Sequence, residues 1–523
     1  MLVTNRGRVR FAAMNGYWMN RRCFLRGAGA WLGAAAAGIR ADTEKFRTVS
    51  IFHTTDLHGH IVPTRTYEGV ENVGGFARCA TCIRQWRRES PHSLLVDLGD
   101  VYQGTAESLL NQGKLMIGLF NQLGYDAWAL GNHDFDWGPE ALERNLALSK
   151  SPILSGNIRV SGKPPGTLGG AWKSVRSWTM KDVGGFRIAL IGLITPGLPY
   201  WLNPQTLGGV VVEHPLQALQ RSISEARAEK ADAIVVMGHM GWRREDDFAN
   251  PVREILKSAP GVDVFLAGHT HQDQPSWKVG KVLCSQASYH GIHCGRVDLT
   301  FDIASRKLIG RDAQTVLMDA GFELDPTVMD TAAPEMKTAA EQLARKVATV
   351  TAPIKSGGRD NPLARLFCEC FAEALQRNRT PVQGVFHGTF GTGDMKPGDL
   401  TVGDCWKLLP YENLLVTAEL GARELIDILK EERSIRTSDR ILWPFELMLS
   451  QNGEVLSFKH HDTPVADDAR FTIAFNSYDA QSGGRTLMRL REIVSQPSAK
   501  LTMTGIDTRG ALIDGLLARG EIR

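Results

Sequence analysis

Five short segments in the first 300 residues carry side-chain types that bind divalent metal ions. They are Asp56-Leu57-His58, Gly99-Asp100, Gly131-Asn132-His133-Asp134, Gly238-His239 and Gly268-His269-Thr270-His271. Any one of them alone is typical of a turn, but together they supply imidazole nitrogens with carboxylate and amide oxygens, and no thiolate. These donors suit borderline metals such as Zn²⁺ or Mn²⁺. The combination predicts a site for two metal ions, with a central aspartate as the bridging ligand.

Each of the five segments follows a short apolar run, and these runs are the strands that must position the ligands. Four of the five segments begin with glycine, which lets the backbone turn sharply where a strand ends. We expect strands at Thr48–His53, Ser93–Asp97, Asp126–Leu130, Arg187–Ile194, Ala233–Met237, Val262–Ala267 and Val282–Cys284. Helical patterns fall between them, at Gly75–Glu89, Ala106–Leu123, Pro139–Lys150, Pro215–Glu229 and Asn250–Ser258. Alternating strands and helices predict an α/β domain, over residues 42–325, whose active groups gather at the carboxyl ends of the strands.

The length of 523 residues exceeds the roughly 250–300 that one core supports, so we expect a second domain. A polar, Ala/Lys/Glu-rich stretch at residues 326–350 predicts a linking helix. Residues 351–523 then form a smaller α/β domain. Its expected helices are Pro362–Gln376 and Ala422–Glu432, and its expected strands are Leu415–Glu419 and Arg470–Phe475.

Residues 1–41 differ from the rest of the chain, because they hold seven arginines, no lysine and no acidic residue. Arg21-Arg22 precede Phe24-Leu25, an apolar segment runs from Gly27 to Gly38, and small residues lie near position 41. This pattern predicts a cleavable export peptide of the twin-arginine type, handled by the twin-arginine export machinery. The protein would then be periplasmic or secreted. The alternative is an N-terminal helix of the fold. Loss of seven arginines would change the formal charge from +3 to −4.

Composition excludes other classes. A net charge near zero gives no sign of a nucleic-acid polymer as partner. The chain has no run of about 18 apolar residues, so membrane insertion is not expected.

Removing residues 1–41 would leave seven of the eight cysteines. Cys79 with Cys82, and Cys284 with Cys294, are the local disulfide candidates, but sequence leaves the pairing open.

The five ligand segments resemble those of the calcineurin-like metallophosphoesterases, and within them the secreted 5′-nucleotidase family. The resemblance implies a four-layer β-sandwich flanked by helices, followed by the smaller α/β domain. It also implies a role for each ligand. One metal ion would take Asp56, His58, Asp100 and His271, the other would take Asp100, Asn132, His239 and His269, and Asp100 would bridge the two.

The resemblance further implies hydrolysis of phosphate monoesters by in-line attack of metal-activated water on phosphorus. Two nearby cations clamp a phosphate and lower the pKa of bound water. His133 resembles the family's transition-state-stabilising histidine, with Asp136 orienting it. The expected esters are 5′-nucleotides, with nucleotide sugars and cyclic nucleotides as further possibilities. The flanking His53 and His60 are expected to be structural or to support the ligands, and His290 and His293 are left open between structural and supporting roles.

In the second domain, the resemblance places substrate-binding residues in Leu409-Pro410-Tyr411-Glu412-Asn413 and Phe475-Asn476-Ser477-Tyr478. Tyr411 and Tyr478 would sandwich a base, Asn413 would contact it, and Arg359 would preserve one family arginine. Two departures are evident. His387-Gly388-Thr389-Phe390-Gly391-Thr392 lacks the family's arginine, and Gly483-Gly484-Arg485-Thr486 has a cation where the family has an acid. Arg485 would therefore suit a more anionic or a non-nucleotide ester.

Two other functions fit the same motifs. One is a thiosulfate-releasing hydrolase of the sulfur-oxidation type, which would act on a protein-bound sulfonate and be inactive on free AMP. The other is a catalytically silent nucleotide- or metal-binding receptor. The receptor fits poorly because every expected metal ligand is present together with His133 and Asp136.

Overall fold

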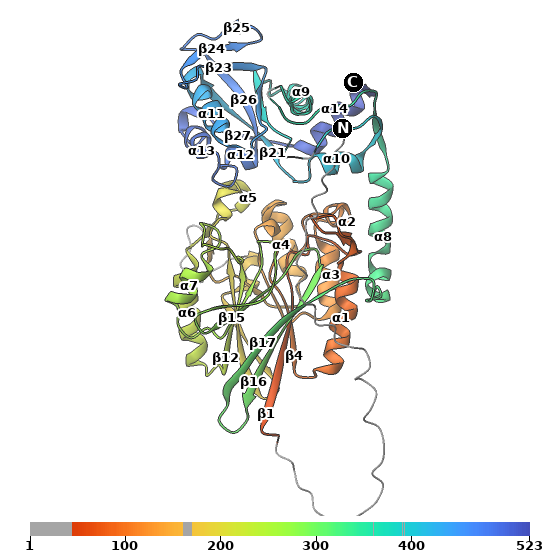
Figure 1. Ribbon diagram of the computed structural model, residues 1–523, viewed down its shortest axis with the longest axis vertical. Coiled ribbons are helices and arrows are strands. Elements are labelled where there is room, and N and C mark those ends of the chain that lie inside the picture. The colour runs from red at the N-terminus through yellow and green to blue at the C-terminus, as the bar shows by residue number, and fades with distance from the viewer. Residues whose placement is uncertain (1–43, 161–169, 359, 390, 392) are drawn as a thin grey trace, which may run out of the picture. The chain divides into compact units, whose positions relative to one another are not determined.

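The computed structural model describes residues 44–160, 170–358, 360–389, 391 and 393–523 (Figure 1). The expected export peptide at residues 1–41 and the expected substrate residue Arg359 lie outside these ranges. Residues 45–523 form one compact unit. Within it, an N-terminal part carries the five ligand segments and a C-terminal part carries the expected substrate residues.

Two sheets form the centre of the N-terminal part. The first has seven strands in the order β17-β16-β1-β4-β5-β6-β8, and the second has six in the order β14-β15-β13-β12-β10-β9. The strands of the first are Lys307–Leu317, His293–Asp302, Phe46–Thr54, Ser93–Asp97, Ala127–Ala129, Ile153–Leu154 and Val175–Arg176. Those of the second are Asp273–Val279, Val282–Ala287, Val264–Ala267, Ala233–His239, Phe186–Ile194 and Trp178–Val183. In the first sheet β1, β4 and β5 are parallel, and in the second β10, β12 and β13 are parallel.

The two sheets pack face to face, with helices on the outside (Figure 1). Val49 and Ile51 of β1 lie in the same buried core as Leu190 of β10 and Val235 of β12, which fills the space between the sheets. A second core joins the first sheet to α1, α3 and α4, and a third joins the second sheet to α6 and α7. These helices are Phe76–Glu89, Lys114–Leu123, Gly138–Leu148, Pro215–Ala228 and Val252–Ser258. The expected four-layer sandwich is thereby confirmed.

The prediction of a single helix over Ala106–Leu123 is wrong. The segment forms two helices, α2 (Ala106–Leu110) and α3. Gln112 and Gly113 break it by adopting left-handed backbone angles, with φ of 50° and 84°. The other expected N-terminal helices and strands are present, with ends displaced by up to three residues. The long antiparallel hairpin of β16 and β17 was not foreseen.

The expected linking helix over 326–350 also needs correction. Helix α8 covers Pro326–Leu343, capped at its start by the Asp325 side chain. The remaining Lys346–Val350 is a strand, β18, paired with β20 (Gly398–Thr401) and β28 (Glu521–Ile522). Its sequence Lys-Val-Ala-Thr-Val is rich in β-branched residues, which favour a strand over a helix.

The C-terminal part is built on a five-stranded sheet in the order β22-β19-β26-β21-β27. The strands are Ile441–Trp443, Gly384–His387, Arg470–Asn476, Leu414–Gly421 and Thr502–Asp507. One core joins the sheet to α9 (Pro362–Arg377) and α14 (Thr508–Arg519). Another joins it to α11 (Ala422–Ser434) and α13 (Met488–Val494). The two expected strands and both expected helices of this region are therefore present.

All seven cysteines of the described ranges are buried free thiols. Cys284 packs in the core beside α6 and α7, whereas Cys294 packs in the core beside α1, so this candidate pair lies on different sides of the sandwich. Cys79 and Cys82 both lie on α1 and are not bonded to each other. Neither expected disulfide candidate is formed.

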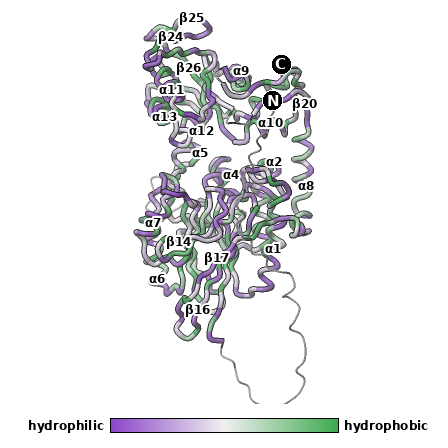
Figure 2. Tube along the Cα trace, viewed as in Figure 1, coloured by the Kyte–Doolittle hydropathy of each residue, from purple (hydrophilic) through white to green (hydrophobic). Residues whose placement is uncertain are grey.

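Helices in the described ranges are not long and apolar enough to cross a membrane. Figure 2 shows polar and apolar residues intermixed along them.

Candidate metal centre and substrate pocket

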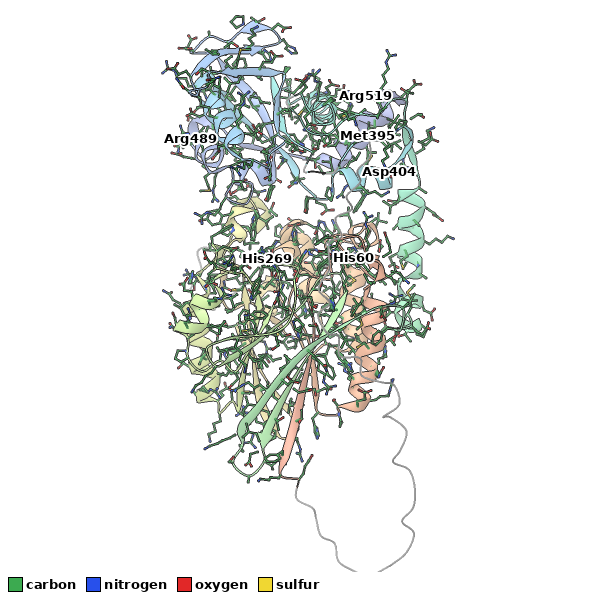
Figure 3. All side chains as sticks on the ribbon, viewed as in Figure 1. His60, His269, Met395, Asp404, Arg489 and Arg519 are labelled. Atoms are coloured by element: carbon green, nitrogen blue, oxygen red, sulfur yellow. The ribbon has the colours of Figure 1, made fainter. Side chains whose placement is uncertain are left out.

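The five ligand segments lie at strand ends. Asp56 and His58 follow β1, Asp100 follows β4, Asn132 and His133 follow β5, His239 ends β12, and His269 and His271 follow β13. Parallel strands place their carboxyl ends at one edge of a sheet. Figure 3 shows His60 and His269, one from each sheet's loops, at the same end of the N-terminal part.

Five of the expected ligands have a backbone conformation that non-glycine residues rarely adopt. Their φ angles are 50°, 48°, 55°, 71° and 55° for Asp56, His58, Asp100, His269 and His271. Each such residue costs of order 1–3 kcal/mol, and such strain clusters at functional sites. The surrounding fold therefore holds these five side chains in fixed, strained positions.

Two glycines bring the turns after β4 and β5 into contact. Gly99 has φ 100°, and a Cβ atom there would lie 2.4 Å from the Gly131 nitrogen. A Cβ atom on Gly131 would lie 2.2 Å from an Asp100 carboxylate oxygen. No larger residue fits at either position. The close approach of the two turns is what places Asp100 beside Asn132.

The first ligand cluster consists of Asp56, His58, Asp100 and His271, whose ligand atoms lie within 4.8 Å of one another. His271 Nε2 lies 3.3 Å from Asp56 Oδ1 and 3.1 Å from His58 Nε2. His58 Nε2 lies 3.7 Å from Asp100 Oδ2. This is the set of ligands expected for one metal ion.

The second cluster consists of Asp100, His239 and His269. His239 Nε2 lies 3.1 Å from Asp100 Oδ2 and 3.1 Å from the Asn132 side-chain oxygen. Asp100 Oδ2 thus faces an imidazole nitrogen of each cluster. It is buried. A buried carboxylate oxygen between two groups of nitrogen ligands fits a bridging ligand of two cations.

Backbone carbonyl groups fix the orientation of two of the histidines. His58 Nδ1 lies 2.7 Å from the Gln103 carbonyl oxygen, and His239 Nδ1 lies 2.8 Å from the Leu98 carbonyl oxygen. A carbonyl can only accept, so each Nδ1 carries a proton and each Nε2 is directed at the cluster. The orientation of both rings is therefore set by the fold.

The electrostatics of the centre favour added positive charge. Burial lowers the pKa of His58 and of His269 to about 3, which keeps both rings neutral and able to bind a metal. Burial acts in the same direction on His239, but the adjacent Asp100 carboxylate outweighs it and raises the pKa of His239 to about 9. Without a metal ion, the negative charge of Asp100 attracts a proton. A divalent cation would take the proton's place.

Asp134 was not assigned a role from the sequence, yet it holds the two turns together. Its carboxylate accepts the backbone N–H groups of Gly131 at 2.8 Å, Val101 at 3.0 Å and Asp100 at 3.2 Å. The clue in the sequence is its position directly after Asn132-His133, although that position alone did not indicate which backbone groups it would bind.

His133 and Asp136 form the expected pair. His133 Nδ1 lies 2.7 Å from Asp136 Oδ2, and the His133 backbone N–H donates to Asp100 Oδ1 at 2.8 Å. Burial opposes a charge on His133, but the carboxylates of Asp136 and Asp100 outweigh burial and raise its pKa to about 10. The ring is 28% exposed and lines a cavity. A protonated, partly exposed imidazole can donate a hydrogen bond to an anionic ligand.

That cavity, of about 490 Å³, joins the metal centre to the expected substrate residues. From the N-terminal part it is lined by Asn132, His133, Asp136, Trp201, Leu202, Asn203, Thr206 and His269. From the C-terminal part it is lined by Tyr411, Glu412, Asn413, Leu414, Thr437, Asp439, Arg440, Ser477 and Tyr478. The structure therefore brings Tyr411, Asn413 and Tyr478 into one cavity with His133.

Arg440 is a cavity residue that sequence reasoning missed. Its guanidinium donates to Asp479 through two hydrogen bonds of 2.9 and 2.7 Å. It lies in Arg-Thr-Ser-Asp-Arg, which resembles no motif. Arg485, expected to add charge at the site, does not line the cavity. Its guanidinium lies 5.3 Å from the ring centre of Tyr200 and 5.0 Å from that of Phe248.

The remaining histidines near the motifs lie outside the two ligand clusters. His60 and His290 stack on each other with ring centres 3.6 Å apart. His53 is fully buried, and burial lowers its pKa to about 3. His293 Nε2 lies 3.6 Å from Asp273. None of these four histidines belongs to either ligand cluster of the described residues.

Comparison with known proteins identifies two segments. Residues 49–273 match the calcineurin-like phosphoesterase family, and residues 346–490 match the 5′-nucleotidase C-terminal domain. A 5′-nucleotidase from Bos taurus is 30% identical over 305 residues, which cover 54% of this chain and 51% of that protein. The chain thus spans about half the length of this curated relative.

Solved structures share the fold over most of the chain. A 5′-nucleotidase precursor from Thermus thermophilus is 23% identical, with 91% of this chain and 97% of that one covered, at a TM-score of 0.67. A sulfate thiohydrolase from the same species is 18% identical, with 91% and 95% covered, at a TM-score of 0.60.

The fold and the clustered ligands define a two-part protein of the metallophosphoesterase class. With both family matches, the chain belongs to the calcineurin-like phosphoesterases that carry a 5′-nucleotidase C-terminal domain.

Proposed function

We propose that the protein is an exported phosphoesterase with two metal ions that hydrolyses phosphate monoesters, with 5′-nucleotides as the preferred class. One observation carries the proposal. Asp100 Oδ2 is shared by two ligand clusters, and the cavity beside them holds both the His133–Asp136 pair and the two tyrosines.

We assign one metal ion to Asp56, His58, Asp100 and His271, and the other to Asp100, Asn132, His239 and His269. The nitrogen and oxygen donors suit Zn²⁺ or Mn²⁺. Two divalent cations there would supply Lewis acidity and lower the pKa of bound water.

The chain's own residues then bind and orient the ester. His133 is held through Nδ1 by Asp136, so its Nε2–H is free to donate to a phosphate oxygen as charge develops during in-line attack by water. Tyr411 and Tyr478 offer ring faces for stacking a base, and Asn413 offers its amide group. Arg359 is proposed as a further substrate contact.

We further propose the arrangement along the chain. Residues 1–41 would be a twin-arginine export signal that directs the protein to the periplasm or the exterior. Residues 42–325 would be the catalytic domain, 326–350 the connection, and 351–523 the substrate-binding domain. The arginine-rich, acid-free composition of residues 1–41 supports the first assignment.

A substrate panel tests the proposal. Purified protein loaded with Mn²⁺ or with Zn²⁺ is assayed on mononucleotides, nucleotide sugars, cyclic nucleotides and a thiosulfonate. We expect the highest kcat/KM on a 5′-mononucleotide. Activity confined to the thiosulfonate would instead support the thiosulfate-releasing hydrolase, whose solved relative shares the fold. Inactivity on every ester with either metal would support the non-catalytic receptor.

A further inference from the structure

Tyr67 contacts His271, an assigned metal ligand, from a surface turn that carries none of the five ligand segments. It lies in the turn between β2 (Thr64–Arg65) and β3 (Glu71–Val73), and its side chain is 65% exposed. Its hydroxyl oxygen nevertheless lies 2.7 Å from Nδ1 of His271, an assigned metal ligand. No sequence motif indicated this contact.

The Tyr67 side chain is held in place despite its exposure. Its backbone N–H donates to the hydroxyl of the buried Tyr289 at 2.8 Å. The two tyrosine rings stack with centres 4.2 Å apart and an interplanar angle of 11°. Tyr289 also stacks on His271, with centres 5.1 Å apart. The turn itself is closed by hydrogen bonds between Thr66 and Val70. Tyr67, Tyr289 and His271 therefore form one packed unit.

His271 is supported differently from the other oriented ligands. His58 and His239 are each held through Nδ1 by a backbone carbonyl of the loop after β4. His271 is held through Nδ1 by a side-chain hydroxyl on a surface turn. A hydroxyl can donate or accept, so this contact alone does not decide which nitrogen of His271 carries the proton. The tautomer depends also on what Nε2 binds.

We propose that Tyr67 is a positioning residue for the metal ion assigned to Asp56, His58, Asp100 and His271. The Nδ1–H of His271 donates to the Tyr67 hydroxyl, which leaves the Nε2 lone pair directed at the cluster, 3.3 Å from Asp56 Oδ1. The opposite tautomer would place a proton on Nε2 and block coordination. The inference rests on the proposed metal assignment. It also predicts that this ion is the more easily lost of the two.

Tyr67→Phe tests the role, because it removes the hydroxyl and keeps the ring that stacks on Tyr289. Loss of such a supporting hydrogen bond lowers metal affinity by about 10–100-fold. We expect this loss for one of the two bound ions, measured without substrate by calorimetric titration of the metal-free protein with Mn²⁺ and by metal content after dialysis. With Mn²⁺ in large excess, kcat should return towards the wild-type value.

Tyr200→Phe is the matched control, since it removes a tyrosine hydroxyl that lies outside the metal centre while keeping the ring. We expect it to bind both ions as the wild type does. If Tyr67→Phe also binds both ions with unchanged affinity, the positioning role is wrong while the metal centre stands. If the wild-type protein binds no Mn²⁺, the metal assignment itself fails, and the role of Tyr67 fails with it.

Discussion

The candidate metal centre and the C-terminal side of the cavity are built on different principles. The metal ligands follow strand ends, five of them have left-handed backbone angles, and Asp56, Asp100 and His239 are at most 1% exposed. On the other side, Tyr411 is 52% exposed, and the polar groups are held through side-chain pairs such as Arg440–Asp479. The fold thus fixes the candidate metal ligands through its backbone, whereas the C-terminal side of the cavity is formed by side chains such as the exposed Tyr411. Substitutions on the two sides should therefore have different consequences.

The largest effect is expected from Asp100→Asn. Its carboxylate is the only side chain in both ligand clusters of the described residues, so its loss should weaken both ions at once. Activity should fall by more than the roughly 100–1,000-fold that follows removal of one transition-state donor. Metal content and kcat on p-nitrophenyl phosphate measure this. A variant that retains two ions with full affinity would contradict the bridging role.

His133→Ala should lower kcat by about 100-fold or more, because it removes the proposed donor to the phosphate. Metal content should stay at the wild-type level, since His133 belongs to neither ligand cluster. His214→Ala is a control in the N-terminal part, because His214 lies on the surface. This substitution should leave kcat and metal content unchanged. Normal turnover in His133→Ala would exclude the assignment.

Tyr411→Ala should act on the substrate side alone. Stacking of a base on an aromatic ring contributes about 1–3 kcal/mol, so KM for AMP should rise while kcat/KM for p-nitrophenyl phosphate changes little. Tyr411→Phe keeps the ring face and should behave as wild type. Equal losses on both substrates would show that Tyr411 does not bind the base.

The smallest effect is expected from Arg485→Ala. Its guanidinium packs on Tyr200 and Phe248 outside the cavity, and an exposed contact of this kind contributes about 0.5–1 kcal/mol. Thermal unfolding should show a slightly lower Tm, with KM for AMP unchanged. A marked rise in KM for anionic esters would instead place Arg485 at the substrate, as first expected from the sequence.

Sequence predicted which side chains cluster at the strand ends because the signals for them are local. Each ligand directly follows an apolar strand, and Gly99 and Gly131 mark turns that only glycine can form. What it missed depends on contacts between distant segments. Arg440 and Asp479 are 39 residues apart, and Tyr67 and His271 are 204 apart. The hairpin of β16 and β17 was not predicted because β17 contains no buried residue, so it lacks the apolar run that marks the other strands. Lys346–Val350 was assigned to a helix because its strand partners, β20 and β28, are remote in sequence.

The most direct test of the central claim is the hydrolysis of AMP by metal-free protein as Mn²⁺ is added in measured equivalents. If the two clusters act together through Asp100, activity should be absent without metal and should reach its maximum at two ions per chain. Full activity in the metal-free protein, or a maximum at one ion per chain, would contradict a shared two-metal centre.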